Sequence, residues 1–251
     1  MVFIIHLKFI QNYGVQTYLN NPGFFAILLK LFLMRKNERF RLVLNYFLTH
    51  HPVAETELIY TDPYELVVAV ILSAQCTDKR VNIITPPFFQ RFPNASSLAG
   101  AEPLQVFELI RSCSYPNNKT RNLIGMAKSL VENYEGILPS DIDELQKIPG
   151  IGRKTANVIA SVIYNKPALA VDTHVFRVSA RIGLTSDAKT PLQTEQQLVR
   201  YIPEQLRAIA HHWLILHGRY VCLARKPKCA ECGLRLFCKF FMTNQVTWSC
   251  W

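Results

Sequence analysis

Four cysteines lie within seventeen residues of one another near the end of the chain, at Cys222, Cys229, Cys232 and Cys238. Six, two and five residues separate successive members of this group. The other three, Cys76, Cys113 and Cys250, are scattered along the chain. Such clustering indicates metal binding in a reducing compartment rather than a disulfide framework. Four thiolates suit zinc or a [4Fe–4S] cluster, and the spacing alone leaves both open.

A second group of residues suited to chemistry lies in the segment Leu145–Ala156, which reads Leu-Gln-Lys-Ile-Pro-Gly-Ile-Gly-Arg-Lys-Thr-Ala. It predicts a short helix capped near Asp141, a Pro-Gly-Ile-Gly hairpin and a second helix that starts at once. Gly150 and Gly152 allow the backbone to come close to a ligand. Backbone N–H groups at the start of the second helix then form an anion site suited to a DNA phosphate. An ordinary helical hairpin is the alternative.

Lys154 falls in the first turn of that second helix, and Asp172 precedes the helix expected over 173–182. Taken singly, such a lysine is usually a solvated charge and such an aspartate is usually an N-cap. Together they offer a nucleophile and a carboxylate. A neutral amine can attack an electrophilic carbon and form a Schiff base. A carboxylate can stabilise a nearby positive charge and help to move a proton.

The elements that must position these residues are predicted to be helices. The run Asp62-Pro63-Tyr64-Glu65 predicts a helix start, with Asp62 as N-cap, Pro63 in the first position and Glu65 closing a capping box. Residues 66–72 are apolar on every side, which predicts a helix buried at the centre. Further helices are expected over 36–55, 104–112, 119–134, 141–147, 153–164, 173–182, 192–201 and 203–217, with breaks at Pro86-Pro87, Pro93-Asn94 and Pro116-Asn117-Asn118. No stretch alternates with a period of two, so the predicted fold class is all-α.

The composition favours a polyanionic partner. Among 251 residues, 28 are Lys or Arg and 18 are Asp or Glu, and the pI is about 9.3. Residues 1–33 are apolar, but Lys8, the more polar stretch 11–21 and Lys30 interrupt them, so no membrane span is expected. The first residues are apolar rather than basic, and no small-residue cleavage site follows, so no signal peptide is expected. We expect Met34 to begin the working protein, residues 1–33 to be a disordered or loosely docked extension, and the protein to be cytoplasmic.

The full hairpin string, with Arg153 and Lys154 following, resembles the helix-hairpin-helix element of the endonuclease III family of DNA glycosylases. Lys154 and Asp172 match that family's lysine and aspartate in type and in surrounding motif. The resemblance implies that Lys154 attacks the C1′ atom of a sugar, displaces the base and forms a Schiff base that permits elimination of the 3′ phosphate. It implies that Asp172 stabilises the positively charged sugar and helps to move the proton. The cysteine spacing, after the segment His211–Tyr220, also matches, and this resemblance implies a [4Fe–4S] cluster rather than zinc. In the family the loop after the first of these cysteines touches the DNA backbone. Here that loop carries Arg225, Lys226 and Lys228, for which a plain solvated loop is the alternative.

The resemblance also singles out Gln75, in the run Ser73–Asp78. In the family this glutamine enters the space left by an extruded base and offsets part of the cost of unstacking. An ordinary polar residue at a helix end is the alternative. The family's second wedge, usually aliphatic, falls near residues 113–117, where this sequence departs, so Tyr115 or the loop backbone is expected to serve instead. His174, beside Asp172, is expected to contact DNA or to support Asp172.

The resemblance covers about residues 36–238 and implies two helical lobes with DNA bound between them. A six-helix barrel over 56–166 would hold the helix-hairpin-helix. An iron–sulfur cluster lobe would combine 36–55 with 167–238, and 239–251 would be a C-terminal tail. The implied activity is that of a monomeric bifunctional DNA glycosylase and AP lyase of base excision repair. It would remove oxidised pyrimidines from double-stranded DNA and cleave 3′ to abasic sites by β-elimination.

Two alternatives stay open. An adenine glycosylase of the same superfamily shares the cysteine spacing, but it has a small residue where Lys154 stands and a further C-terminal recognition domain. A non-catalytic binding or redox protein would use only the cluster and the basic surface. The presence of both Lys154 and Asp172 argues against it.

Overall fold

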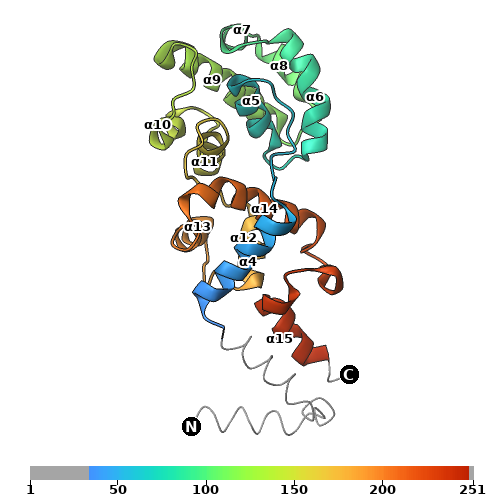
Figure 1. Cartoon of the computed structure of the whole chain (residues 1–251). Helices are drawn as coiled ribbons and strands as arrows, with labels where there is room; N and C mark the ends of the chain where they lie inside the picture. Colours follow the sequence, from blue (N-terminus) through green and yellow to red (C-terminus); the bar gives the residue numbers. More distant parts are fainter. Residues whose placement is uncertain (1–33, 249–251) are drawn as a thin grey trace, which may run out of the picture. The chain divides into compact units, whose positions relative to one another are not determined.

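The computed structural model describes residues 34–248, and throughout that range it contains helices, turns and loops but no strand (Figure 1). This confirms the predicted all-α class. None of the helices in the described range is long and apolar enough to cross a membrane. The expectations for residues 1–33 and for Met34 as the first working residue concern a segment outside the described residues.

The chain divides into two compact units. The hairpin unit comprises residues 55–170 and 204–212, and the cysteine unit comprises residues 34–54, 171–203 and those from 213 onward. The predicted division also built one of its two lobes from segments near both ends of the chain. It differs in placing residues 204–212 in the cluster lobe. The hairpin unit contains α5 (Pro63–Ser73), α6 (Asp78–Arg91), α7 (Ala95–Ala99), α8 (Pro103–Ile110), α9 (Pro116–Tyr134), α10 (Ile142–Lys147) and α11 (Arg153–Val162).

The cysteine unit contains α4 (Lys36–His50), α12 (Thr173–Ile182), α13 (Pro191–Val199) and α15 (Lys239–Trp248). Helix α14 (Arg207–Tyr220) begins in one unit and ends in the other, and the short 3-10 turns η1 (Glu204–Leu206), η2 (Cys229–Glu231) and η3 (Arg235–Phe237) complete the list. Helix α4 stops at His50 and not at residue 55, because Pro52 follows closely and disfavours helical backbone in the residue before it. Helix α15 occupies most of what was expected to be a tail.

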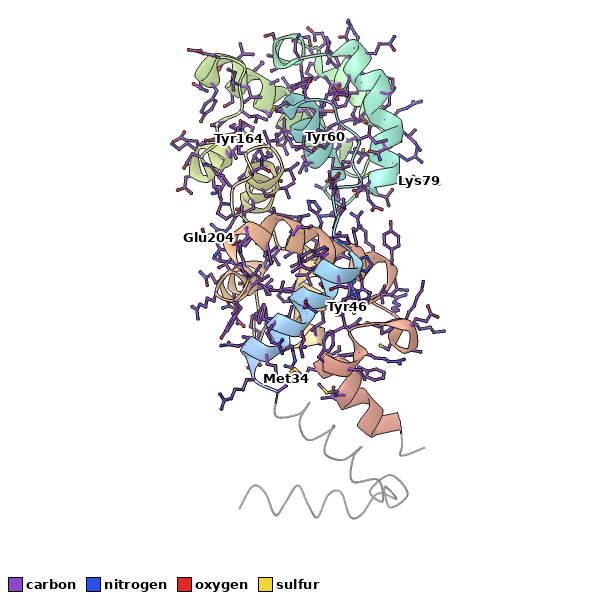
Figure 2. The ribbon with its side chains drawn as sticks, in the orientation of Figure 1. Met34, Tyr46, Tyr60, Lys79, Tyr164 and Glu204 are labelled. Atoms are coloured by element: carbon purple, nitrogen blue, oxygen red, sulfur yellow. The ribbon has the colours of Figure 1, made fainter. Side chains whose placement is uncertain are left out.

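Helix α5 is the buried centre of the hairpin unit, as predicted. All seven residues from Leu66 to Leu72 are buried, and Tyr60, labelled in Figure 2, packs against the same core. Asp62 caps the helix by accepting from Glu65 N–H at 2.8 Å. The Glu65 carboxylate, however, accepts from the N–H and hydroxyl of Thr61 at 2.7 and 2.8 Å. Glu65 therefore accepts from the residue before the N-cap, whereas in the predicted capping box it would accept from the N–H group of Asp62 itself.

The prediction that Pro86-Pro87 would break the chain is wrong, because both prolines lie inside α6. Both are exposed, so the carbonyl groups that lose their N–H partners there lie on the side facing water. Ile84, Thr85 and Phe88 are buried in the core and hold the opposite face of the helix in place. The break at Pro93-Asn94 is confirmed, since Asn94 caps α7. Residues 116–118 instead form the first turn of α9, and the break falls at residues 111–115.

The cysteine unit is held together by contacts of its first helix with its last segments. The Phe47 ring on α4 stacks on Trp213 with centroids 5.4 Å apart, and Trp213 Nε1 donates to His51 O at 2.7 Å. The buried Arg39 donates from Nε to Phe237 O at 3.1 Å and from Nη1 to Gly183 O at 3.4 Å. Helix α4 therefore forms part of the support beneath the cysteine segment.

Candidate functional site

The hairpin between α10 and α11 is a tight turn anchored by two buried isoleucines. Ile148 and Ile151 are 2% and 3% exposed, and Ile151 N–H donates to Ile148 O at 3.1 Å. Gly150 has a φ of +82°, which with Pro149 before it is the pattern of a type II turn. A Cβ atom at residue 150 would lie 2.9 Å from the Cβ of Asn122. Backbone angle and space both require glycine here.

Gly152 has a different role from Gly150. It is the N-cap of α11 with φ −83° and ψ 176°, and no side chain caps the helix at this position. A Cβ atom at residue 152 would meet nothing within 4 Å. The protein fold therefore does not require glycine at this position. The exposed backbone at the start of α11 is open to a partner from outside, as an anion site requires.

Lys154 and its neighbour Arg153 are both exposed in the first turn of α11. The opposite face of the helix is buried, including Ala156, Ile159 and Ala160. Burial of that face fixes the direction in which the first turn presents its side chains. The hairpin therefore places a primary amine, a guanidinium group and uncapped helix backbone within one turn, a combination that can hold a phosphate group next to a nucleophile.

Asp172 is the N-cap of α12, as predicted. Its Oδ1 atom accepts from Val175 N–H at 2.7 Å, and its own backbone carbonyl accepts from Phe176 N–H at 2.9 Å. The residue is half-buried. The cap uses one of its two carboxylate oxygens for the bond to Val175. Asp172 belongs to the cysteine unit and Lys154 to the hairpin unit.

His174 is engaged within the cysteine unit. Its Nδ1 atom lies 3.2 Å from Nη2 of Arg177, and a Cβ atom at Gly218 would lie 2.9 Å from the His174 Cβ. Helices α12 and α14 therefore approach closely at this point, and His174 packs where they meet. The structure gives it a packing role, and its expected contact with DNA stays a prediction.

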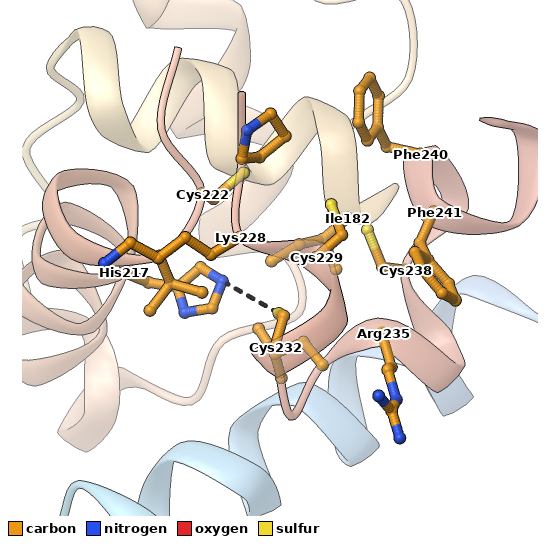
Figure 3. A pocket seen from close by; sticks show the side chains of 13 residues that line it. Ile182, His217, Cys222, Lys228, Cys229, Cys232, Arg235, Cys238, Phe240 and Phe241 are labelled. Atoms are coloured by element: carbon orange, nitrogen blue, oxygen red, sulfur yellow. Dashed lines mark hydrogen bonds between the residues drawn. The ribbon is translucent and has the colours of Figure 1, made fainter. Parts of the chain in front are cut away.

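The four clustered cysteines line one pocket, shown in Figure 3. The pocket holds about 350 Å³ of space not filled by protein atoms, including its mouth, and its walls include Ile182, Phe240 and Phe241. All four thiols are free cysteines, and Cys232 Sγ lies 3.6 Å from His217 Nε2. Burial raises the pKa of Cys238 to about 11. Among the described residues, no three His, Cys, Asp or Glu side chains converge closely enough to hold a single metal ion.

Two arginines one turn apart on α12 hold the loop that begins at Cys222. Arg177 donates to Cys222 O at 3.1 Å and to Gly218 O at 2.9 Å. Arg181 donates to Leu223 O at 2.7 Å and to Ala224 O at 2.9 Å, and its Nη1 lies 3.5 Å from Cys222 Sγ. Sequence reasoning missed both residues, although their spacing of four on one helix was a signal that they share a face.

The loop these arginines hold carries the predicted basic residues. Arg225, Lys226 and Lys228 are all exposed, and Lys226 has a φ of +50°. The loop closes where Lys228 N–H donates to Val221 O at 3.0 Å. Because the backbone is fixed at both ends, the three cations project from a constrained surface loop of the cysteine unit.

Gln75 and Tyr115 lie on two neighbouring loops of the hairpin unit. Gln75 follows α5 and is exposed with a φ of +54°; Tyr115 precedes α9, is 60% exposed and has a φ of +56°. The Ser114 hydroxyl donates to Gln75 O, which joins the two loops. Non-glycine residues rarely adopt this left-handed backbone, and such strain clusters at functional sites. The structure thus brings together the two residues that the sequence singled out as candidate wedges.

The chain matches the model of the HhH-GPD superfamily of base excision DNA repair proteins over residues 68–204. It is 45% identical to endonuclease III of Bacillus subtilis over 188 residues, which cover 75% of this chain and 86% of that protein. It is 42% identical to endonuclease III of Rickettsia felis over 199 residues, covering 79% and 93% of the two chains.

Solved structures agree with these sequence comparisons. The fold is similar to that of an endonuclease III trapped as a covalent intermediate on DNA, with a TM-score of 0.80 and 39% identity. The similarity covers 84% of this chain and 100% of that one. A match at this level of identity and coverage extends across both units. The chain therefore belongs to the endonuclease III family, the DNA glycosylases and AP lyases of base excision repair.

Proposed function

We propose that this enzyme removes oxidised pyrimidines from double-stranded DNA and cuts the strand through a Schiff base on Lys154. The observation that carries the proposal is the exposed amine of Lys154 in the first turn of α11, directly after the Gly150 turn. A related endonuclease III of similar fold has been trapped covalently on DNA, which supports a covalent step in the proposed reaction.

In this mechanism the Lys154 Nζ attacks the sugar C1′ atom as a neutral amine while the damaged base leaves. The sugar ring then opens to give an imine between Nζ and C1′. Loss of a proton from C2′ breaks the bond between C3′ and its oxygen and so releases the 3′ phosphate. Hydrolysis of the imine returns the free amine. Two groups are therefore needed besides the nucleophile: one to move protons and one to hold the phosphates in place.

Asp172 is proposed as the group that stabilises the positive charge on the sugar and moves the protons. Its N-cap bond to Val175 N–H holds the carboxylate in a fixed orientation and occupies only one of its oxygens. The second oxygen is the one assigned to the substrate. A carboxylate that is already oriented loses no side-chain freedom during the reaction, which is the advantage of using a helix cap for this purpose.

Phosphate contacts are assigned to the backbone at Gly150 and Gly152, to Arg153 and to the basic loop of the cysteine unit. The open space at Gly152 and the exposure of Arg225, Lys226 and Lys228 support this assignment. Gln75, with Tyr115 as second wedge, is proposed to fill the gap left by the extruded base. Both residues are exposed, and both have a backbone in the left-handed region. Replacement of stacking by these side chains would offset part of the cost of extrusion.

We further propose that Cys222, Cys229, Cys232 and Cys238 hold a [4Fe–4S] cluster. The donor set fits, since four free thiols and no carboxylate line a single pocket with largely apolar walls. Such a group bound to four thiolates would tie the segment together and so position the basic loop; we assign it no part in bond cleavage. Metal analysis of anaerobically purified protein tests this. About four irons per chain support the cluster, and stoichiometric zinc without iron would overturn it.

Borohydride trapping tests the proposed reaction. The wild-type enzyme is incubated with duplexes that carry an oxidised pyrimidine, an abasic site or adenine opposite a damaged purine, and the imine is reduced to a stable covalent complex. We expect trapping on the first two duplexes only. Lys154→Ala is expected to abolish trapping and nicking while DNA binding is kept.

Lys147→Ala provides the matched control. Lys147 lies in the same motif on α10, is exposed and pairs with Glu144 at 2.5 Å. Its replacement is expected to leave trapping unchanged. Full trapping by the Lys154→Ala protein would disprove the assignment of the nucleophile, and trapping only on the adenine duplex would disprove the lesion class.

A further inference from the structure

Two cysteines outside the clustered four face each other in the hairpin unit. Cys76 follows α5 and Cys113 follows α8, and their Sγ atoms are 3.7 Å apart although the two residues are 37 positions apart in sequence. Cys113 is 4% exposed and belongs to the core, whereas Cys76 is partly exposed and packs against that core. Cys76 directly follows Gln75, and Cys113 lies two residues before Tyr115.

The surroundings of the pair include a buried cation. Lys119 is 4% exposed, and its Nζ atom donates to Leu72 O at 2.7 Å, near the end of α5. Burial and the neighbouring Cys76 raise the pKa of Cys113 to about 11, while the positive charges of Lys119 and Arg80 act in the opposite direction. Cys113 is therefore a poor first nucleophile. The partly exposed Cys76 is the sulfur that a reagent from solution reaches first.

We propose that Cys76 and Cys113 form a site of reversible disulfide formation that ties the two wedge loops together. The oxidant is a low-molecular-weight disulfide. The Cys76 thiolate attacks one of its sulfur atoms, breaks the S–S bond and releases one small thiol. The Cys113 thiolate then attacks Cys76 Sγ and releases the second. The two cysteines lose two protons and two electrons in total, and the small disulfide gains them as two thiols.

The geometry decides which loop moves. A disulfide requires the sulfur atoms to be about 2.05 Å apart, so the pair must close by less than 2 Å. Cys113 is fixed in the core, and Cys76 lies on a short connection between α5 and α6. Cys76 therefore moves toward Cys113, and the adjacent Gln75 is drawn inward with it. The oxidised enzyme should then reach less well into the base stack. This step of the inference rests on the role proposed above for Gln75.

The experiment uses the full-length enzyme with its metal centre, equilibrated with oxidised glutathione and then digested with trypsin. Cleavage after lysine and arginine gives peptide 42–79, in which Cys76 is the single cysteine, and peptide 112–119, in which Cys113 is the single cysteine. We expect these peptides to be joined, with loss of two hydrogen atoms, and to separate on reduction. A glutathione adduct on Cys76 without the cross-link would overturn the proposal.

Function is measured on the same samples. Oxidation is expected to slow single-turnover base excision by about tenfold, a barrier higher by about 1.4 kcal/mol. The salt dependence of binding to undamaged duplex, which depends on phosphate contacts, should stay unchanged. Cys113→Val fills the same buried space without a thiol and should be insensitive to oxidised glutathione. Cys76→Ser, at the partly exposed position, repeats the test if the first variant fails to fold.

The two proposals fail in different ways. If the cross-link forms and the excision rate is unchanged, the disulfide is established. The inferred displacement of Gln75 and its effect on base excision are then disproved. A reduced enzyme that does not process oxidised pyrimidines would count against the proposed function. The joined peptides would still report on the cysteine pair in that case, because their detection requires no DNA.

Discussion

Gly150 and Gly152 are two residues apart in one hairpin, yet alanine should have opposite effects at the two positions. At residue 150 the φ of +82° places alanine in the left-handed region, at a cost of about 1–2 kcal/mol. The added methyl group would lie 2.9 Å from Asn122 Cβ and 3.4 Å from Ile71 Cδ1, and overpacking costs about 1–3 kcal/mol. Alanine also restricts the unfolded chain more than glycine does, which stabilises the folded protein by roughly 0.4–1 kcal/mol. The middle of these ranges gives an expected net destabilisation of about 3 kcal/mol.

Thermal unfolding followed by circular dichroism measures this effect. At this chain length, the melting temperature of Gly150→Ala should fall by roughly 5–15 °C. For Gly152→Ala, φ is −83° and the methyl group meets nothing within 4 Å, so stability should be unchanged or higher by up to about 1 kcal/mol. Its affinity for duplex DNA should nevertheless fall, because the methyl group occupies the space assigned to a phosphate. A Gly150→Ala protein that melts within about 2 °C of the wild type would refute the turn argument.

Three further predictions concern other parts of the site. Asp172→Asn should keep the cap of α12, since asparagine caps as well as aspartate, yet it should slow single-turnover excision by orders of magnitude. A rate within about threefold of the wild type would mean that Asp172 acts only as a helix cap. Replacing Lys226 and Lys228 together by alanine should lower the log–log salt slope of DNA binding by about two, and an unchanged slope would show that this loop does not contact DNA. Arg181→Met should increase proteolytic cleavage of the basic loop, because the two bonds to Leu223 O and Ala224 O are lost, whereas resistance equal to that of the wild type would contradict the bracing role.

Local signals in the sequence were sufficient where the interaction is itself local. The caps at Asp62, Asp141 and Asp172 are all formed, because each depends on a side chain and a backbone N–H group two or three residues ahead. The hairpin turn is of the same kind, since Pro149, Gly150 and the bond from Ile151 N–H to Ile148 O all lie within four consecutive residues. These features position the proposed nucleophile and its carboxylate. The elements that carry the chemistry were therefore predictable, even though the roles of their residues stay to be tested.

Features that depend on distant segments were not predictable in this way. Pro86-Pro87 reads as a break, but burial of Phe88 and its neighbours in the core keeps α6 intact. The hydrogen bonds from Arg181 to the basic loop join residues that are more than forty positions apart in sequence. The closeness of Cys76 to Cys113 likewise appears only once the connections after α5 and α8 have come together in the fold. In each case tertiary packing supplies the free energy, and no short window of sequence reports it.

The cysteine unit combines the first described helix with segments from the far end of the chain, and this order matters while the protein is being made. The buried face of α4, with Phe47 among its residues, packs on Trp213, and Arg39 bonds to Phe237 O. At about 5–20 residues per second, the ribosome needs roughly 10–40 s to travel from α4 to the last of these partners. Residues 55–170 of the hairpin unit emerge within that interval and can fold first, whereas α4 has to wait with its apolar face uncovered. The partners that cover the buried face of α4 therefore become available only when translation is almost complete.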